Sequence, residues 1–306
     1  MPRRGVLVVP VVTPYTRDSL EVDVEGLEWL LQRLAEAGAN GFFVAGTTGE
    51  KELLSVDEIG RLVEVAVRVG GGRVKVFSGT PSARVSEALE AARLAGGLGA
   101  DHVMTTPPLY YNPGPRGVIE YYKKLALASE DATVYAYTIP SHVGYNIPLD
   151  VVEALASEGV IEGVKATVSD SSYIVSLSRV KERVEDFTLF SGIAEVLPLA
   201  LAHGWDGAVD ALANVAPGIT LGMLHAWRDG DTKKLSKLAR IAARASQALR
   251  PYGLQGGLKA LLAEMGAPIS RAVRPPLTTP PDTIVKAVKN LLCNGSKEVL
   301  LLGLKC

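Results

Sequence analysis

The stretch Val160-Ile161-Glu162-Gly163-Val164-Lys165-Ala166-Thr167 is a short apolar run that carries a lysine near its end. Such a run predicts a buried strand, because the strands of parallel sheets are covered on both faces. A lysine amine becomes nucleophilic near neutral pH only where apolar surroundings or another cation disfavour its ammonium form. A lysine at the mouth of a barrel strand can meet that condition. The competing interpretation is that Lys165 only leads the chain back into water.

Strand-like runs and helical patterns alternate on both sides of this stretch. Apolar spacing predicts a helix over 24–37, and the capping box Ser55-Val56-Asp57-Glu58 opens another. Eight consecutive strand–helix units predict an α/β fold, a closed (β/α)₈ TIM barrel. An open doubly wound sheet is the alternative, but no G-x-G-x-x-G follows the first strand. The other predicted strands are 6–12, 41–44, 74–78, 102–105, 133–138, 188–191 and 207–211.

The pattern changes after the eighth unit. We expect the barrel to occupy residues 1–225. Residues 226–293 are mostly helical by pattern and predict a C-terminal helical appendage on the barrel rather than a free domain. Residues 294–306 form an apolar tail, which we expect either to pack on the barrel or a neighbour, or to be disordered.

Composition excludes several classes of protein. The chain has 306 residues, 47% of them hydrophobic and 21% charged, with a net charge of −1, which is ordinary for a globular protein. No basic stripe indicates nucleic acid, and no apolar run reaches the length of a membrane span. Cys293 and Cys306 lie close together near the C-terminus and predict neither a disulfide framework nor a metal site. A cytoplasmic protein is expected.

Two features at strand ends carry possible chemistry, since barrel enzymes place their active sites at the carboxyl ends of the strands. In Gly46-Thr47-Thr48-Gly49, two glycines let backbone N–H groups turn toward a small anion, and the threonines add hydroxyls, so the segment is a candidate carboxylate cradle. An ordinary turn is the alternative. Tyr137 ends the fifth predicted strand, where it can move protons; Tyr135 is interpreted as a core tyrosine.

Taken in order, six short motifs resemble the dihydrodipicolinate synthase / N-acetylneuraminate lyase family of pyruvate-dependent class I aldolases and lyases. The resemblance covers about residues 6 to 292. Its motifs are Gly46-Thr47-Thr48-Gly49-Glu50, Tyr110-Tyr111-Asn112, Tyr137 with Ile139-Pro140-Ser141, Gly163-Val164-Lys165, Ser191-Gly192 and Ala213-Asn214-Val215.

The resemblance implies a role for each motif residue. Lys165 would form a Schiff base with the keto carbon of pyruvate or of a 2-oxo acid that is cleaved to pyruvate. Thr47 and Thr48, in the turn that begins at Gly46, would hold the carboxylate. Tyr137 would be the general acid/base, in a hydroxyl relay with Thr47 and with Tyr111 of a neighbouring subunit. The resemblance therefore implies a homo-oligomer, a dimer of dimers, with no metal and no cofactor beyond the lysine imine.

Departures from the family pattern bear on the second substrate. Dihydrodipicolinate synthases carry an arginine where this chain has His142, and histidine lacks the bidentate guanidinium that binds the aldehyde's carboxylate. Ile193 replaces the polar residue expected for a polyhydroxylated substrate. Thr167 remains suited to hydrogen-bond a substrate hydroxyl. Val209 and Asp210 end the eighth predicted strand, where Asp210 could touch the distal part of the substrate or could instead be the partner of a helix or loop.

These observations rank three hypotheses. A short-chain 2-keto-3-deoxy acid aldolase comes first; such an enzyme forms or cleaves the carbon–carbon bond between a 2-oxo acid and an aldehyde. A 4-hydroxy-tetrahydrodipicolinate synthase acting on pyruvate and aspartate semialdehyde is the alternative. A barrel that binds pyruvate without turnover is the third, and intact Lys165, Tyr137 and both threonines speak against it.

Overall fold

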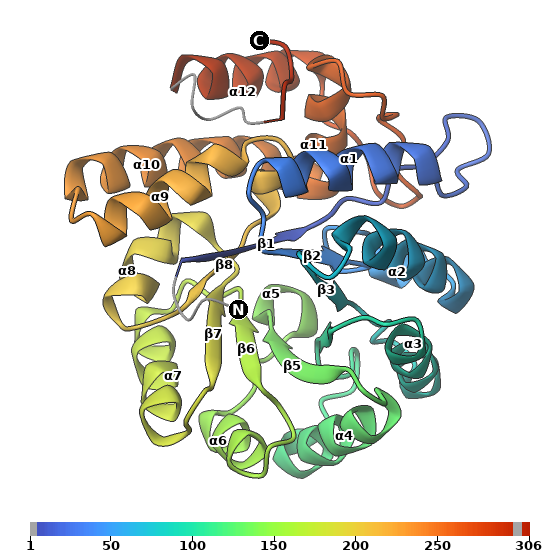
Figure 1. Cartoon of the computed structure of the whole chain (residues 1–306), viewed down its shortest axis with the longest axis vertical. Helices are drawn as coiled ribbons and strands as arrows, with labels where there is room; N and C mark the ends of the chain where they lie inside the picture. Colours follow the sequence, from blue (N-terminus) through green and yellow to red (C-terminus); the bar gives the residue numbers. More distant parts are fainter. Residues whose placement is uncertain (1–4, 296–301) are drawn as a thin grey trace.

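A computed structural model describes residues 5–295 and 302–306 of the chain. Its eight parallel strands close into a barrel in sequence order, β1 to β8, with β1 pairing to β8 (Figure 1). The predicted (β/α)₈ barrel is confirmed. The strands are β1 (Val6–Pro10), β2 (Gly41–Val44), β3 (Lys75–Ser78), β4 (His102–Thr105), β5 (Thr133–Thr138), β6 (Gly163–Ala166), β7 (Thr188–Ser191) and β8 (Gly207–Val209).

Helices cover the outside of the barrel and connect successive strands. Their inner faces are apolar at helical spacing; in α1, for example, Leu27, Leu30, Leu31 and Leu34 are buried. The capping box at Ser55 and Glu58 is present and starts α2. The connecting helices are α1 (Val24–Glu36), α2 (Val56–Gly70), α3 (Val85–Gly97), α4 (Gly114–Ala128), the short α5 (Pro140–Val143), α6 (Leu149–Ser157), α7 (Ser171–Arg183), α8 (Leu197–Ala202) and α9 (Pro217–Arg228).

Side chains alternate along each strand between the barrel interior and the layer beneath the helices. Phe77, Tyr135 and Phe190 fill the interior, with ring centroids 5.4 to 6.4 Å apart. On β6, Val164 and Ala166 belong to the outer layer, so the side chain between them faces inward. The interior is thus a packed aromatic core, and the place to look for a substrate site is the end of the barrel where the strands have their carboxyl ends.

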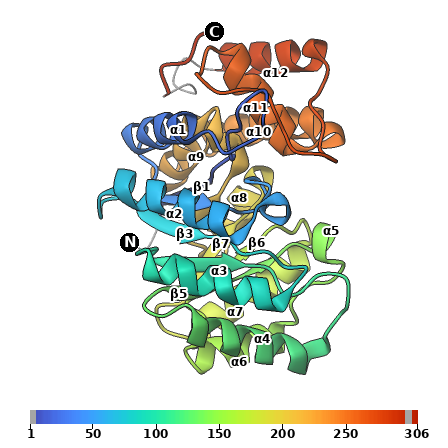
Figure 2. The same ribbon diagram turned by 90° about the vertical axis from the view of Figure 1, so that its right-hand side faces the viewer.

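In the described part of the chain, three further helices lie on the side of the barrel that α1 and α9 cover (Figures 1 and 2). They are α10 (Thr232–Leu249), α11 (Leu254–Glu264) and α12 (Asp282–Gly295), with α10 beside α9 and α12 outermost. Helix α9 continues to Arg228, three residues past the expected end of the barrel at residue 225. The division of the chain into 1–225 and 226–293 stays a prediction. The tail expected over 294–306 lies partly outside the described residues, at 296–301.

The end of the chain returns to the C-terminal helices. Leu302 is buried, and the Lys305 N–H donates to the Met265 carbonyl at 2.9 Å. Cys293 and Cys306 form a disulfide with a Cα–Cα distance of 5.8 Å. The sequence reading, which expected no disulfide framework, did not anticipate this bond, because proximity in sequence does not show that the chain turns back on α12. None of the helices in the described part of the chain has the length and apolarity that a membrane crossing requires.

Candidate active site

Lys165 stands on β6 at the open end of the barrel. Its side chain faces the interior and is 3% exposed. The Nζ atom lies 3.9 Å from the ring centroid of Tyr137, its cross-strand partner on β5, and 4.9 Å from that of Phe43 on β2. Among residues 5–295 and 302–306, none forms a hydrogen bond or ion pair with this amine. A lysine held among rings without an acceptor is poorly suited to stay charged.

Electrostatics agrees with that geometry. Burial, followed by the nearby cation of Lys51, lowers the pKa of Lys165 to about 7, while the carboxylate of Asp210 acts in the opposite direction. Near neutral pH a large share of the amine is therefore uncharged, which is the form that attacks a ketone carbon. The interpretation of Lys165 as a residue leading into solvent is wrong.

Tyr137 presents its hydroxyl to the same space. The Thr167 hydroxyl donates to the Tyr137 oxygen at 3.2 Å, and the Thr47 hydroxyl is close enough to lower the phenol's pKa. Burial has the larger effect and raises the pKa of Tyr137, so the group stays a proton donor at neutral pH. Gly192 makes room for Thr167, since a Cβ at residue 192 would lie 2.0 Å from the Thr167 hydroxyl oxygen.

The predicted cradle is a tight turn after β2. Ala45 and Glu50, on either side of Gly46–Gly49, both have left-handed backbones, with φ of 50° and 64°. Non-glycine residues in this region cost about 1–3 kcal/mol each and cluster at functional sites. In the described part of the chain no group accepts from the N–H of Thr47 or of Thr48. Two unpaired N–H groups beside two hydroxyls suit a carboxylate.

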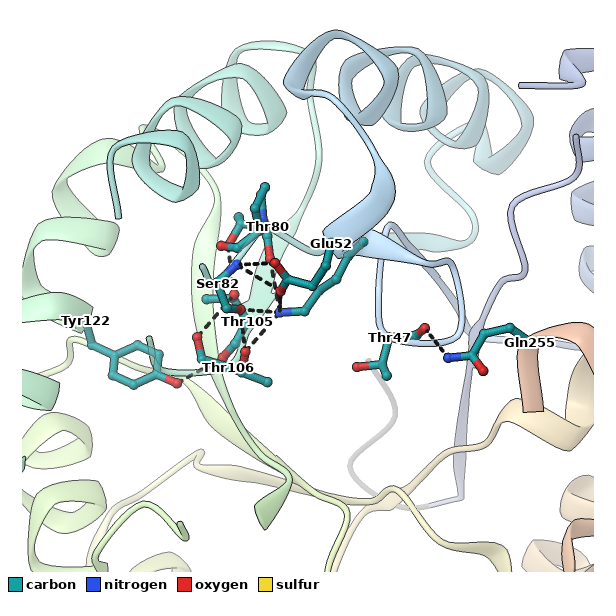
Figure 3. Close-up of polar contacts among 10 residues, drawn as sticks. Thr47, Glu52, Thr80, Ser82, Thr105, Thr106, Tyr122 and Gln255 are labelled. Carbon is teal, nitrogen blue, oxygen red and sulfur yellow. Dashed lines mark hydrogen bonds and ion pairs between the residues drawn. The ribbon is translucent and has the colours of Figure 1, made fainter. Parts of the chain in front are cut away.

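The C-terminal helices hold this turn from outside. Gln255 on α11 donates from Nε2 to the Thr47 carbonyl at 3.0 Å, while the Thr47 hydroxyl points into the mouth (Figure 3). Lys259, also on α11, is paired with Glu50, the residue that ends the turn. The helical appendage is therefore a part of the site's scaffold.

Other predicted site residues lie in different settings. Tyr111 is 79% exposed, and its ring packs edge-on against that of Tyr110, with the ring centroids 4.9 Å apart. Its role across a subunit interface stays a prediction. His142 is exposed on α5, with Nδ1 3.0 Å from the Ser141 hydroxyl.

Val209 and Asp210 end β8. Val209 belongs to the packed barrel interior. Asp210 is buried and accepts from the Leu212 N–H at 3.1 Å and from the Thr220 hydroxyl, so it caps the following 3₁₀ turn. Burial raises its pKa, and the charge of Lys165 opposes that shift. Contact between Asp210 and the distal part of a substrate stays a prediction, and both of its carboxylate oxygens have partners within the chain.

Sequence reasoning missed a second lysine in the mouth. Lys51 is buried directly after the cradle, and its Nζ donates to the Thr80 carbonyl, Ser82 and Thr106 (Figure 3). A signal was present, because small hydroxyl residues follow both β3 and β4 and can line a polar pocket. Within the described residues, no group of three or more His, Cys, Asp or Glu side chains could hold a metal ion.

Residues 3–294 match the Dihydrodipicolinate synthetase family. The chain belongs to this family. It is therefore an enzyme of a family of lyases and aldolases, and the resemblance drawn from its motifs is confirmed. Among its curated relatives, an uncharacterized DapA-like lyase of Thermofilum pendens is 32% identical over 98% of this chain and 97% of its own length. The 4-hydroxy-tetrahydrodipicolinate synthase of Methanopyrus kandleri is 35% identical over 76% of this chain and 77% of its own length.

A solved structure of the dihydrodipicolinate synthetase family superimposes over nearly the whole chain. The prophage protein YagE of E. coli K12, determined in complex with pyruvate, has a TM-score of 0.87 and 27% identity, and covers 95% of this chain and 98% of its own. The family assignment thus rests on sequence and on fold together.

Proposed function

We propose that this enzyme is a Schiff-base-forming class I aldolase that uses pyruvate, or a 2-oxo acid cleaved to pyruvate, with Lys165 as the nucleophile. The observation that carries the proposal is the amine of Lys165, which is buried 3.9 Å from the centroid of the Tyr137 ring and has no ion-pair partner within residues 5–295 and 302–306. The carboxylate cradle at Thr47 and Thr48 and the pyruvate bound to the relative YagE support the choice of substrate.

The chemistry follows from the groups present. The neutral amine of Lys165 adds to the keto carbon, and loss of water from the carbinolamine gives an imine. Once protonated, the imine nitrogen is an electron sink, so a proton or a carbon–carbon bond beside it can be lost to an enamine. Tyr137 gives the proton to the departing water and takes it back, with Thr47 and Thr167 beside its oxygen. The cradle fixes the orientation of the carboxylate and hence the face that reacts.

We propose that the reaction forms or cleaves a short-chain 2-keto-3-deoxy acid, so that the partner of pyruvate is a short-chain aldehyde rather than aspartate semialdehyde. Histidine at residue 142 offers no guanidinium for a second carboxylate, and Ile193 offers no hydrogen bond to a string of hydroxyls. Thr167 can bond a single hydroxyl near the reacting carbon. Completion of the relay by the partner subunit's Tyr111 in a dimer of dimers, and a cytoplasmic location, belong to the same proposal.

Reductive trapping tests the imine. Incubation with pyruvate and borohydride should add one reduced pyruvyl group to the peptide that contains Lys165. Borohydride alone, and pyruvate with the Lys165→Met variant, are the controls and should leave the mass unchanged. An absence of adduct in the unaltered protein would falsify the imine mechanism.

The synthase alternative is favoured by one observation, the identity of 35% to the Methanopyrus kandleri synthase. A panel of aldehydes, read out as pyruvate consumption, separates the two. Activity confined to aspartate semialdehyde would reverse the ranking. Activity with neutral short-chain hydroxyaldehydes would support the aldolase.

A further inference from the structure

Lys51 is a second buried lysine in the mouth, and the proposed chemistry does not use it. The residue follows the cradle directly and is 6% exposed. Its Nζ donates to the Thr80 carbonyl at 3.1 Å, to the Thr106 hydroxyl at 2.9 Å and to the Ser82 hydroxyl. Figure 3 shows these three groups gathered where β3 and β4 end. The ammonium is thus held in one place by three oxygen atoms.

The charge of Lys51 is only partly balanced. The Glu52 carboxylate lies 3.4 Å from Nζ, but it is one-third exposed, and it also accepts the Ser82 N–H at 2.9 and 3.2 Å. The hydroxyls and the carbonyl that hold the ammonium are dipoles and carry no net charge. Part of the positive field therefore extends into the mouth of the barrel.

The pairing of β4, β5 and β6 places Lys165 near the ammonium of Lys51. In the pairing of β4 with β5, Thr105 is the partner of Ala136, so Thr106 and Tyr137 are the residues that follow this pair, and Tyr137 is the cross-strand partner of Lys165. Neighbouring strands are about 4.8 Å apart. The amine bound to Thr106, after β4, and the amine over the Tyr137 ring, from β6, therefore lie on the two sides of β5 at the same end of the barrel, and both lysines are buried.

We propose that Lys51 is a positioning residue whose fixed ammonium keeps Lys165 in its free-amine form, ready to attack the substrate. The inference rests on the proposed imine chemistry at Lys165. It assigns to Lys51 an electrostatic role and no contact with the substrate.

None of the other titratable groups described around Lys165 supplies a positive charge that would favour its free-amine form. Tyr137, from β5, is neutral. His142, from α5, is exposed as a whole residue, but partial desolvation of its ring and then the charges of the two lysines lower its pKa. Asp210, after β8, opposes the effect. Burial lowers the pKa of both lysines, but three oxygen acceptors and the Glu52 carboxylate at 3.4 Å hold the ammonium of Lys51, whereas no acceptor in the described part of the chain holds that of Lys165.

The test is the pH profile of reductive trapping in charge variants. Lys51→Met removes the ammonium, while Ser82 and Thr106 can still bond each other across 2.6 Å. We expect the midpoint for Lys165 to rise by about one pH unit, so that trapping well below the midpoint falls about tenfold. Lys51→Gln, which keeps a donor for the Thr80 carbonyl, should shift the midpoint in the same way. Lys51→Arg, which keeps the charge, should leave it in place.

A matched control is Lys181→Met, which removes a partly buried lysine paired with Asp206 at the opposite end of the barrel. Its midpoint should equal that of the unaltered protein even if its stability falls. Three outcomes would each overturn the inference. They are midpoints in all three Lys51 variants that do not differ from that of the unaltered protein, the same upward shift in all three variants including Lys51→Arg, and an adduct on the Lys51 peptide. Failure of the unaltered protein to be trapped would instead overturn the proposed function.

Discussion

The barrel mouth and the junction between the barrel and the C-terminal helices each bury a lysine, and the partners of the two differ. Lys259, at the junction, is paired with Glu50, and both side chains are fully buried. It also donates to the Ala272 carbonyl at 2.9 Å. Lys165, in the mouth, faces aromatic rings and, in the described part of the chain, has no acceptor. Burial alone therefore does not distinguish a structural lysine from a nucleophile.

The sign of the neighbouring charge makes the difference. Burial lowers the pKa of Lys259 to about 8, and the Glu50 carboxylate opposes that shift. At Lys165 burial lowers the pKa to about 7, and the charge of Lys51 adds to the effect. We therefore expect substitutions in the mouth to change rates and substitutions at the junction to change stability.

Loss of the nucleophile should give the largest effect. Lys165→Met removes the amine, and we expect activity to fall on the order of 10⁵-fold or more, since the covalent route is lost. Thermal stability should stay the same or rise, because no partner is left unpaired. Steady-state rates and melting curves of the variant check both parts. A large loss of stability would mean that Lys165 has a structural role like that of Lys259.

Removal of the phenol should have the next largest effect. Tyr137→Phe deletes the proton donor, and we expect kcat to fall about 10²- to 10⁴-fold with little change in KM for pyruvate. Tyr135→Phe, two residues earlier and facing the same way, is the matched control and should retain activity. Similar losses in both variants would point to packing rather than proton transfer.

At the junction, Lys259→Met leaves Glu50 buried without a counterion. The free energy of unfolding should fall by about 3–5 kcal/mol. Adding Glu50→Gln should recover part of the loss, because a neutral amide is cheaper to bury than a lone carboxylate. Denaturant unfolding of the single and double variants measures both values. An additive loss in the double variant would contradict the pairing.

The smallest effect concerns acid stability at the edge of the junction. Hydrogen bonding to Arg274 lowers the pKa of Glu58 from its ordinary value. The pair's stabilisation is therefore present above the unfolded pKa of about 4.3 and is lost as pH falls through the lower folded value. Arg274→Gln should cost about 1 kcal/mol near pH 7, since the pair is partly exposed, and less near pH 3. Unfolding curves of both proteins at several pH values check this. A difference in unfolding free energy that does not change with pH would show that the Glu58 carboxylate is not the partner responsible.

The barrel was predictable because each strand is a short apolar run that can be recognised from its own residues. Residues 41–44, 102–105, 133–138 and 188–191 were predicted with the bounds that the structure has, and period-two alternation then turns Lys165 inward. What escaped prediction depends on contacts between distant segments. The acceptors of Lys51 come from the ends of two other strands, and Glu50 meets Lys259 across 209 residues of sequence. For Asp210 the sequence left two interpretations open, a contact with the distal part of the substrate and a partner in a helix or loop, and the bonds to Leu212 and Thr220 show the second without testing the first.

The bond from Gln255 to the Thr47 carbonyl has a consequence for the minimal size of this enzyme. A fragment that stopped after Arg228 would keep all eight strands and every residue assigned to bond making or proton movement. It would nevertheless lack Gln255, Lys259 and Arg274, which brace the proposed carboxylate-binding turn through hydrogen bonds to Thr47 and Glu50. Truncation should therefore weaken substrate capture before it disrupts the barrel, and shortened versions for engineering should retain α11 and the segment through Arg274.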